Sequence, residues 1–300
     1  MKQKNVVNLK MLYSLTRVIV FFVVFFLIFN AVTYVLRDKN EAEFLYPYYA
    51  ENIDHEVLFL GPSTARDAFY PLEFYGQYGI SSYNIAQGGQ YFAPNYYLLK
   101  DIIEVQNKSP KVVVLDVFDA TITGKAYEST ERLHELADNM PFWSLKFEML
   151  YNLLDDKKDI SQFLFPISIF HSRWNELNEK DFKKIENPYM GADFSLKIEE
   201  YEQPQFVDSS VKTSLDEISL GYLLKIIELC KKNNIELIMT ALPFNNKVEQ
   251  RLPYLNAVQE VADSNNIKYF NFWYLLQECQ LDFKTDFRNA NHLNSSYLHS

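Results

Sequence analysis

Two residues near opposite ends of this chain are of types that together can carry out acyl chemistry. Ser63 follows a short apolar run and lies in Gly61-Pro62-Ser63, and His292 lies close to the last residue. A serine hydroxyl becomes a nucleophile when a histidine beside it takes its proton. Ser63 and His292 therefore predict an ester hydrolase or acyltransferase, provided that the fold places them side by side.

Alternating apolar and amphipathic segments predict the elements that must position these residues. Strand patterns cover residues 57–60, 82–86, 112–117, 235–241 and 267–272. Helical patterns between them cover residues 63–78 with an interruption at Pro71, 94–108, 214–232 with a capping box at its start, and a segment around 255–262. The unbroken apolar run at 112–117 is typical of a strand buried on both faces. We expect an α/β fold with a parallel sheet between helices, in a three-layer α/β/α architecture.

The predicted strands bring three features to one edge of the sheet, because the carboxyl ends of parallel strands meet there and ligands bind there. Ser63 follows the first strand, at a helix N-terminus that favours negative charge. Gly88-Gly89 follows the second strand, and one of these glycines could direct its backbone N–H at an oxyanion. His292 follows the last strand. Each feature alone also fits a helix cap, a turn or a structural histidine, but together they predict an active site.

Residues 120–205 interrupt the alternation of strands and helices. The segment is charged and aromatic, with a helical stretch at 145–154 and aromatic residues at 163–174. It leaves the sheet after the third strand, so it emerges at the edge where ligands bind and could form a lid or a substrate wall. A purely structural excursion fits the same pattern. We expect a mostly helical insertion within one domain that spans residues 55–300.

The N-terminus has the pattern of a membrane anchor. Residues 1–17 carry four basic side chains and no acidic one, and residues 18–36 are 19 mostly apolar residues. That length spans a hydrocarbon core of roughly 30 Å. A cleaved signal peptide would need small residues at its exit, and a buried core helix would show a polar face. The positive-inside rule predicts a cytoplasmic tail at 1–17, one span at 18–36, a polar linker at 37–54 and an extracytoplasmic domain.

The composition excludes several other classes of protein. Beyond the tail, 25 Lys and Arg residues stand against 39 Asp and Glu residues, and such an acidic domain should not bind nucleic acid. Cys230 and Cys279 form neither a disulfide framework nor a metal motif, and we expect Cys230 to be buried as a free thiol. No Gly-x-Gly-x-x-Gly or P-loop pattern follows a strand, so no nucleotide cofactor is expected. We predict no metal and no organic cofactor.

The chain resembles the SGNH/GDSL hydrolase superfamily, whose core is flavodoxin-like. It is most similar to the membrane-anchored SGNH-like proteins that occur with membrane-bound O-acyltransferases, among them the teichoic acid D-alanyl transfer and alginate O-acetylation proteins. The resemblance is carried by the N-terminal anchor and by Val57–Ala65, Tyr83–Gln90, Val112–Val117, His171–Trp174 and Asp286–Asn294. It implies that Ser63 is the nucleophile, that Gly89 and the Ser63 N–H form the oxyanion hole, and that His292 is the base. It also implies acyl esters of a cell-envelope polysaccharide as substrate and a membrane-bound O-acyltransferase as partner.

The chain departs from this family at three places. The family has Asp-x-x-His, and here Asn289 stands three residues before His292. The asparagine of the third block is not evident, because Asp116-Val117-Phe118-Asp119 stands there. The chain ends where relatives continue into a closing helix, which suggests a truncated product.

The first departure bears directly on activity. In a serine protease, the change from Asp to Asn lowers kcat about 10⁴-fold through the wrong imidazole tautomer. The amide oxygen of Asn289, or nearby Asp286, could orient His292 instead. Two hypotheses remain: a serine-dependent esterase or O-acyltransferase, and a catalytically silent surface protein that binds a glycan or a membrane acyltransferase through the aromatic insertion.

Overall fold

The computed structural model describes residues 2–51, 53–141 and 144–296, and it divides into two compact units. One unit comprises Met1–Asn40 and Ser161–Lys184, and the other comprises Glu41–Ile160 and Ile185–Ser300. The larger unit contains the sheet and every residue that the sequence analysis placed in the site. Each unit is described on its own below.

A parallel five-stranded sheet forms the centre of the larger unit. The strands are β1 (Val57–Leu60), β2 (Ser82–Asn84), β3 (Val112–Asp116), β4 (Glu236–Ala241) and β5 (Lys268–Asn271). Their spatial order is β2-β1-β3-β4-β5, with every neighbouring pair parallel. This is the flavodoxin-like order, and it confirms the predicted α/β fold with a parallel sheet. Each strand begins and ends within three residues of its predicted bounds, because buried parallel strands read as clear apolar runs.

Helices lie between the strands and in the predicted insertion. Those between strands are α3 (Ser63–Ala68), α4 (Pro71–Tyr78), α5 (Phe92–Lys100), η1 (Asp101–Val105), η2 (Phe118–Thr121), α10 (Glu217–Lys232), α11 (Val248–Asn265) and η6 (Phe272–Tyr274). The insertion contains α6 (Thr130–Ala137), α7 (Ser144–Leu153), η3 (Lys157–Asp159), α8 (Ile160–Leu164), α9 (Ile167–Phe170), η4 (His171–Asn175) and η5 (Glu179–Phe182). The predicted break at Pro71 is present, because α3 ends before it and α4 starts on it.

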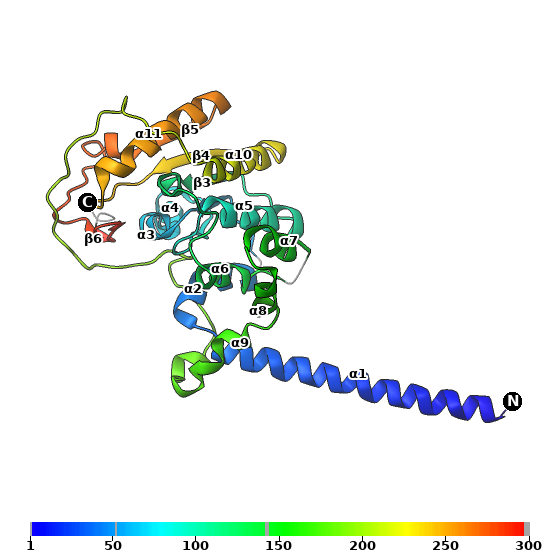
Figure 1. Ribbon diagram of the computed structural model, residues 1–300. Coiled ribbons are helices and arrows are strands. Elements are labelled where there is room, and N and C mark those ends of the chain that lie inside the picture. The colour runs from blue at the N-terminus through cyan, green and yellow to red at the C-terminus, as the bar shows by residue number, and fades with distance from the viewer. Residues whose placement is uncertain (1, 52, 142–143, 297–300) are drawn as a thin grey trace. The chain divides into compact units, whose positions relative to one another are not determined.

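The two faces of the sheet are covered unequally. On one face α5 and α10 lie side by side, and α11 packs on β5 (Figure 1). On the other face Phe59 stacks on Phe69, with ring centroids 4.8 Å apart, and contacts Phe74 of α4 at 5.0 Å. These contacts place α3 and α4 over β1. The same face farther along the sheet is more open, since Phe270 of β5 is 43% exposed.

A small hairpin carries the C-terminal candidate residues. Strand β6 (Phe287–Asn289) pairs antiparallel with β7 (His292–Leu293), and Asn289 lies opposite His292. The sequence predicts only a loop here. A two-residue strand is too short to produce a recognisable apolar alternation, so the sequence alone could not reveal it.

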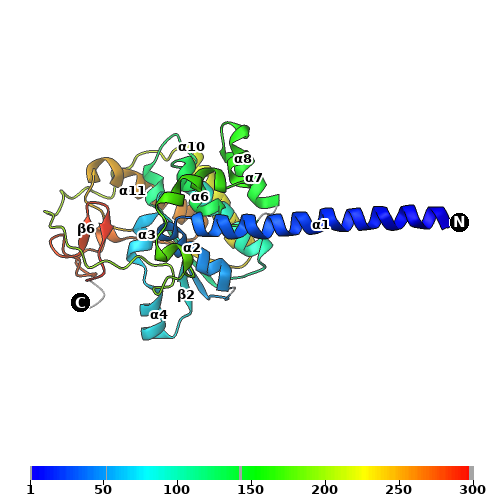
Figure 2. The ribbon, with the colours of Figure 1, turned by 90° about the horizontal axis from the view of Figure 1, so that it is seen from below.

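The smaller unit is built on one long helix, α1 (Lys2–Leu36), drawn in blue in Figures 1 and 2. Its stretch Met11–Leu36 is 26 residues long, and an 18-residue window within it has a mean hydropathy of 2.7 and no buried residue. The guanidinium of Arg173 donates to the carbonyls of Leu36 and Arg37 at 2.8 and 2.5 Å. The insertion segment of this unit is therefore attached to the C-terminal end of α1.

Three sequence predictions need correction. The expected linker at 37–54 forms the helix α2 (Lys39–Glu51), whose side chains Ala42, Leu45 and Tyr48 are buried at helical spacing despite Pro47. The predicted insertion is helical only to Phe182, and residues 183–216 contain no helix or strand. Helix α10 is capped by Asp216, which accepts the Ile218 N–H at 3.0 Å, so the cap lies two residues beyond the predicted one.

Candidate active site

Ser63 lies at the carboxyl end of β1, as the first residue of α3. The turn before it requires glycine. Gly61 has a φ of 140°, and a Cβ there would approach the Asp116 side chain to 3.0 Å. The next residue, Thr64, donates its hydroxyl to the buried carboxylate of Asp116. The end of β3 thus anchors the start of α3 and fixes the position of the Ser63 side chain.

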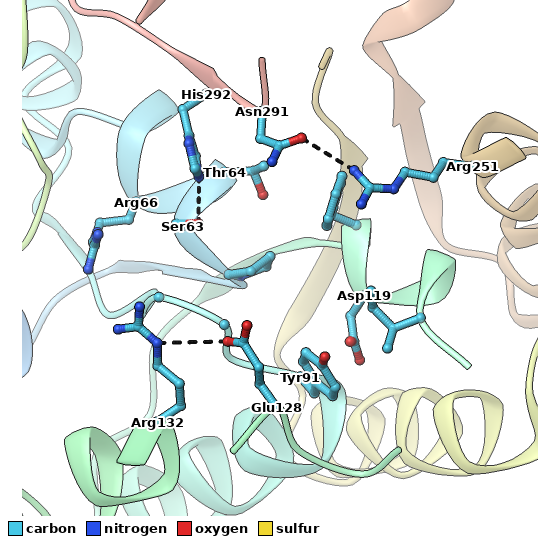
Figure 3. Close-up of a pocket in the computed structure, with 15 residues that line it drawn as sticks. Ser63, Thr64, Arg66, Tyr91, Asp119, Glu128, Arg132, Arg251, Asn291 and His292 are labelled. Carbon is cyan, nitrogen blue, oxygen red and sulfur yellow. Dashed lines mark hydrogen bonds and ion pairs between the residues drawn. The ribbon is translucent and has the colours of Figure 1, made fainter. Parts of the chain in front are cut away.

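Ser63 and His292 are in direct contact, although they come from opposite ends of the chain. The Ser63 hydroxyl lies 2.6 Å from His292 Nε2, and Figure 3 shows the two side chains next to each other in the wall of the pocket. That distance is within the range for a nucleophile and its general base. The fold therefore brings together the two residues that the sequence analysis paired.

Asn289 occupies the position of the third group. Its side-chain oxygen accepts a hydrogen bond from His292 Nδ1 at 2.8 Å. The same oxygen accepts the backbone N–H of Asn291 at 3.0 Å. Because a backbone N–H can only donate, it holds the amide with its oxygen, and not its NH₂, toward the ring. His292 is then protonated on Nδ1 and presents the lone pair of Nε2 to Ser63, which is the tautomer that a general base needs.

Asp286, the alternative acid, forms its hydrogen bonds with residues outside the Ser63–His292 pair. Its carboxylate accepts the backbone N–H of Asp282 and the hydroxyl of Thr285, both at 2.8 Å. These bonds close the turn that precedes the hairpin. Because no hydrogen bond joins Asp286 to His292 in the described part of the chain, the suggestion that Asp286 replaces the missing carboxylate is not supported by the geometry.

Its surroundings keep the His292 ring uncharged. Burial, and to a lesser extent the nearby cations Arg288 and Arg66, lower the pKa of His292 from 6.5 to about 4, while Asp193 opposes the shift. An aspartate at position 289 would counter this effect through its charge, but an amide cannot. His292 is therefore a correctly oriented but weak base.

A partly buried ion-pair group holds the hairpin against the serine helix. Arg288, next to Asn289, approaches Asp67 to 2.7 Å and Asp193 to 2.9 Å. Asp67 belongs to α3, the helix that starts with Ser63, and Asp193 belongs to the irregular part of the insertion. Sequence reasoning missed these residues, because their pairing depends on tertiary contacts between segments far apart in the chain.

Gly89 is placed for a role in an oxyanion hole. It lines the same pocket as Ser63 and His292, and its φ of 61° is a conformation that favours glycine. Within the described residues, neither its N–H nor that of Ser63 donates to another protein group. A Cβ on Gly89 would lie only 1.5 Å from the Glu128 carboxylate. Thus both predicted donors have unused N–H groups, but an acidic side chain lies beside one of them.

The pocket around Ser63 has a volume of about 340 Å³. Sequence reasoning did not identify several polar side chains in its wall: Arg66, Asp119, Glu128, Arg132, Arg251 and Asn291. Glu128 and Arg132 come from the start of the predicted insertion. This part of the insertion therefore forms a pocket wall, which agrees with the first of the two alternatives given for it, a lid or substrate wall. No spacing pattern marks such residues, since each reaches the pocket from a different element.

Similarity to known proteins is confined to solved structures. No protein-family model and no curated protein matches the chain. One similar crystal structure, titled a "putative acylhydrolase" from Bacteroides fragilis NCTC 9343, is 15% identical, with a TM-score of 0.39 over 85% of this chain and 88% of that one. Another, a GDSL-like lipase from Bacteroides thetaiotaomicron VPI-5482, is 14% identical, with a TM-score of 0.38 over 86% and 93%.

Proposed function

We propose that this chain is a membrane-anchored, extracytoplasmic SGNH-like esterase or O-acyltransferase that uses Ser63 as its nucleophile. One observation carries the proposal: Ser63, His292 and Asn289 form a continuous hydrogen-bonded relay, with distances of 2.6 and 2.8 Å. A structural serine at a helix start would not need a histidine held in the tautomer that accepts its proton.

The chemistry follows from the direction of these hydrogen bonds. The Ser63 hydroxyl oxygen attacks an acyl carbonyl while His292 Nε2 takes its proton, and the backbone N–H groups of Ser63 and Gly89 stabilise the oxyanion. His292 then gives the proton to the departing alcohol, which leaves an acyl group on Ser63. Water or a sugar hydroxyl attacks this ester, with His292 as base, and Ser63 recovers its proton. Hydrolysis and transfer differ only in the acceptor.

The acceptor that we propose is a cell-envelope polysaccharide, with water as the alternative, and a membrane-bound O-acyltransferase is the proposed partner. These proposals follow from the family that the sequence motifs resemble. The pocket is compatible with a polar acceptor, because most of its lining side chains are polar or charged. An acylated polysaccharide that donates its acyl group fits the same arrangement.

Membrane anchoring is supported by the smaller unit. The Met11–Leu36 stretch of α1 is long and apolar enough to cross a bilayer. The insertion segment attached to its C-terminal end exposes aromatic side chains, with Phe165, Trp174 and Phe182 at 53%, 70% and 66% exposure. Phe165 also contacts Phe29 of α1 edge to face, with centroids 6.2 Å apart. Exposed aromatic residues beside the end of a span are typical of the membrane–water interface.

A silent binding protein with the same fold is the second candidate, and one observation favours it. The third position holds a neutral amide, and the pKa of His292 is lowered to about 4, chiefly by burial, so the base is weak. In that case the pocket would bind a glycan or another envelope component without turnover.

Turnover of an activated ester separates the two candidates. The full chain in a non-ionic detergent is tested with 4-nitrophenyl acetate, beside Ser63→Ala and His292→Ala. We expect hydrolysis that each substitution lowers at least 100-fold, with circular dichroism and the melting temperature showing that both variants are folded. Equal rates in all three proteins would exclude Ser63 as the nucleophile and leave the silent candidate.

A further inference from the structure

Three arginines line the pocket around Ser63, and two of them have carboxylate partners. Arg66 lies 3.4 Å from Glu41 and 3.8 Å from Asp67. Arg132 lies 2.7 Å from Glu135 and 3.8 Å from Glu128. These two cations are balanced by the protein itself, so they leave little charge for a ligand.

Arg251 of α11 differs from the other two. No carboxylate in the described part of the chain lies within ion-pair distance of its guanidinium. Its Nη1 donates to two neutral oxygens, the Asn246 carbonyl and the Asn291 side chain, both at 3.3 Å. The guanidinium also lies over the Phe118 ring, 5.1 Å from its centroid. Its Nε and Nη2 make no hydrogen bond to a described residue.

A half-buried guanidinium without an anionic partner is costly for the fold. Burial lowers the pKa of Arg251, the direction expected when charge is removed from water without compensation. Arginine nevertheless stays protonated in proteins. Placing such a charge in the wall of a pocket costs stability unless another molecule supplies the counter-charge.

The two carboxyl groups in the pocket wall do not supply that counter-charge. Glu128 is paired with Arg132, as Figure 3 shows. Asp119 accepts the Phe92 N–H at 2.6 Å, and burial raises its pKa to about 8, so it is mostly neutral near pH 7. Its other oxygen is buried and has no hydrogen-bond partner. The side of the pocket near Arg251 therefore carries a net positive charge. The neutral carboxyl group of Asp119 also lines the pocket.

We propose that Arg251 binds an anionic oxygen group, a carboxylate or a phosphate, on the substrate that Ser63 acylates or deacylates. The planar guanidinium pairs with either group through two parallel hydrogen bonds. Arg251 lies close to the reaction centre, because the Asn291 that it holds is the neighbour of His292. The assignment of the anionic group to the substrate rests on the proposed function, but the anion site itself does not.

The anion site is tested first by binding without turnover. The full-length Ser63→Ala protein in a non-ionic detergent is titrated calorimetrically with inorganic phosphate and with succinate. We expect at least one anion to bind, and Arg251→Gln on the same background to weaken its binding about 10- to 100-fold, as the loss of charge-assisted hydrogen bonds predicts. The anion that binds more tightly identifies the chemical class of the group.

A matched control removes one positive charge that also lies beside α11 but outside the pocket. Lys212 pairs with Glu260 of α11 at 2.8 Å and does not line the pocket. Lys212→Gln should leave anion binding unchanged. No binding of either anion, or equal binding in the Arg251→Gln protein, would overturn the inference whether or not the protein is an esterase.

A kinetic experiment connects the site to the substrate. In the protein with Ser63 intact, kcat/KM is compared for mono-4-nitrophenyl succinate, which carries a carboxylate, and for uncharged 4-nitrophenyl acetate. Arg251→Gln should lower the ratio of charged to uncharged kcat/KM about 10-fold or more, and Lys212→Gln should not. Arg251→Gln could abolish anion binding and yet leave the ratio of charged to uncharged kcat/KM unchanged. That result would show that the bound anion is not part of the substrate, and it would overturn the assignment of the site to the substrate.

Discussion

His292 donates its Nδ1 hydrogen to the side-chain oxygen of Asn289 across 2.8 Å, in a loop where the Asn291 N–H holds that oxygen in place. A triad asparagine impairs catalysis in a protease because it stabilises the wrong tautomer. Here the loop prevents that tautomer. The asparagine thus supplies the geometry of a carboxylate but not its charge, and the cost is confined to the stability of the imidazolium that forms during reaction.

Replacing Asn289 separates geometry from charge. Asn289→Asp should raise kcat with 4-nitrophenyl acetate about 10- to 100-fold, because an ionised acceptor stabilises the imidazolium more strongly than an amide. Asn289→Ala should lower kcat, since it removes the acceptor for both His292 and the Asn291 N–H. A lower rate in the Asp variant than in the natural chain would show that another group orients the ring.

The pH dependence of kcat/KM should reflect the depressed pKa of His292. The ring stays neutral down to about pH 4, so the acidic limb of the profile should lie near that value and not near the ordinary histidine value of 6.5. Asn289→Asp should move the limb to higher pH, because a carboxylate raises the pKa of His292. A limb near pH 6.5 in the natural chain would contradict the described environment.

The free energy of unfolding should also change with pH over the interval in which His292 titrates. Between about pH 6.5 and pH 4 the unfolded chain binds a proton at residue 292 that the folded chain does not bind. The free energy of unfolding should therefore fall as the pH is lowered through this range. Denaturant melts of the natural chain and of His292→Gln measure the effect. The proton-linked contribution of residue 292 is the change with pH in the difference between the two curves, and that difference should become constant above pH 7.

Gly89 can be tested against a glycine with the same backbone conformation. Gly89→Ala and Gly124→Ala both place a Cβ at positive φ, 61° and 71°, so each should lose roughly 1–2 kcal/mol of stability. Only at Gly89 does the Cβ meet a neighbour, the Glu128 carboxylate in the pocket wall. Ester hydrolysis should fall at least 10-fold in Gly89→Ala and stay near the natural rate in Gly124→Ala. Equal activities at matched stability would remove Gly89 from the oxyanion hole.

The proposed orientation in the membrane can be tested with a natural thiol. Cys279 is exposed and free, and Cys230 is buried. A membrane-impermeant maleimide should label intact cells that express the full chain, and Cys279→Ser should abolish the labelling. Labelling that appears only after lysis would place the large unit in the cytoplasm.

Much of the fold could be predicted because buried parallel strands are continuous apolar runs. Because the carboxyl ends of parallel strands meet at one edge of the sheet, the strand pattern was enough to pair Ser63 with His292. Other features depend on tertiary contacts that leave no mark on spacing. The sequence pattern of helix α2 predicts a linker, because Pro47 and the polar residues around it hide the spacing of the buried side chains. The roles of Arg288, Asp67 and Arg251 emerge only when distant segments meet, and the amide orientation of Asn289 depends on a single backbone N–H.

Covalent labelling of Ser63 tests the central claim most directly. The full chain is treated with a fluorophosphonate, and the modified residue is located by mass spectrometry of its peptides. We predict one adduct on Ser63, absent in Ser63→Ala and formed at least 100-fold more slowly in His292→Ala, because only a serine paired with a base reacts in this way. No adduct on Ser63, or equal labelling rates with and without His292, would contradict an activated serine.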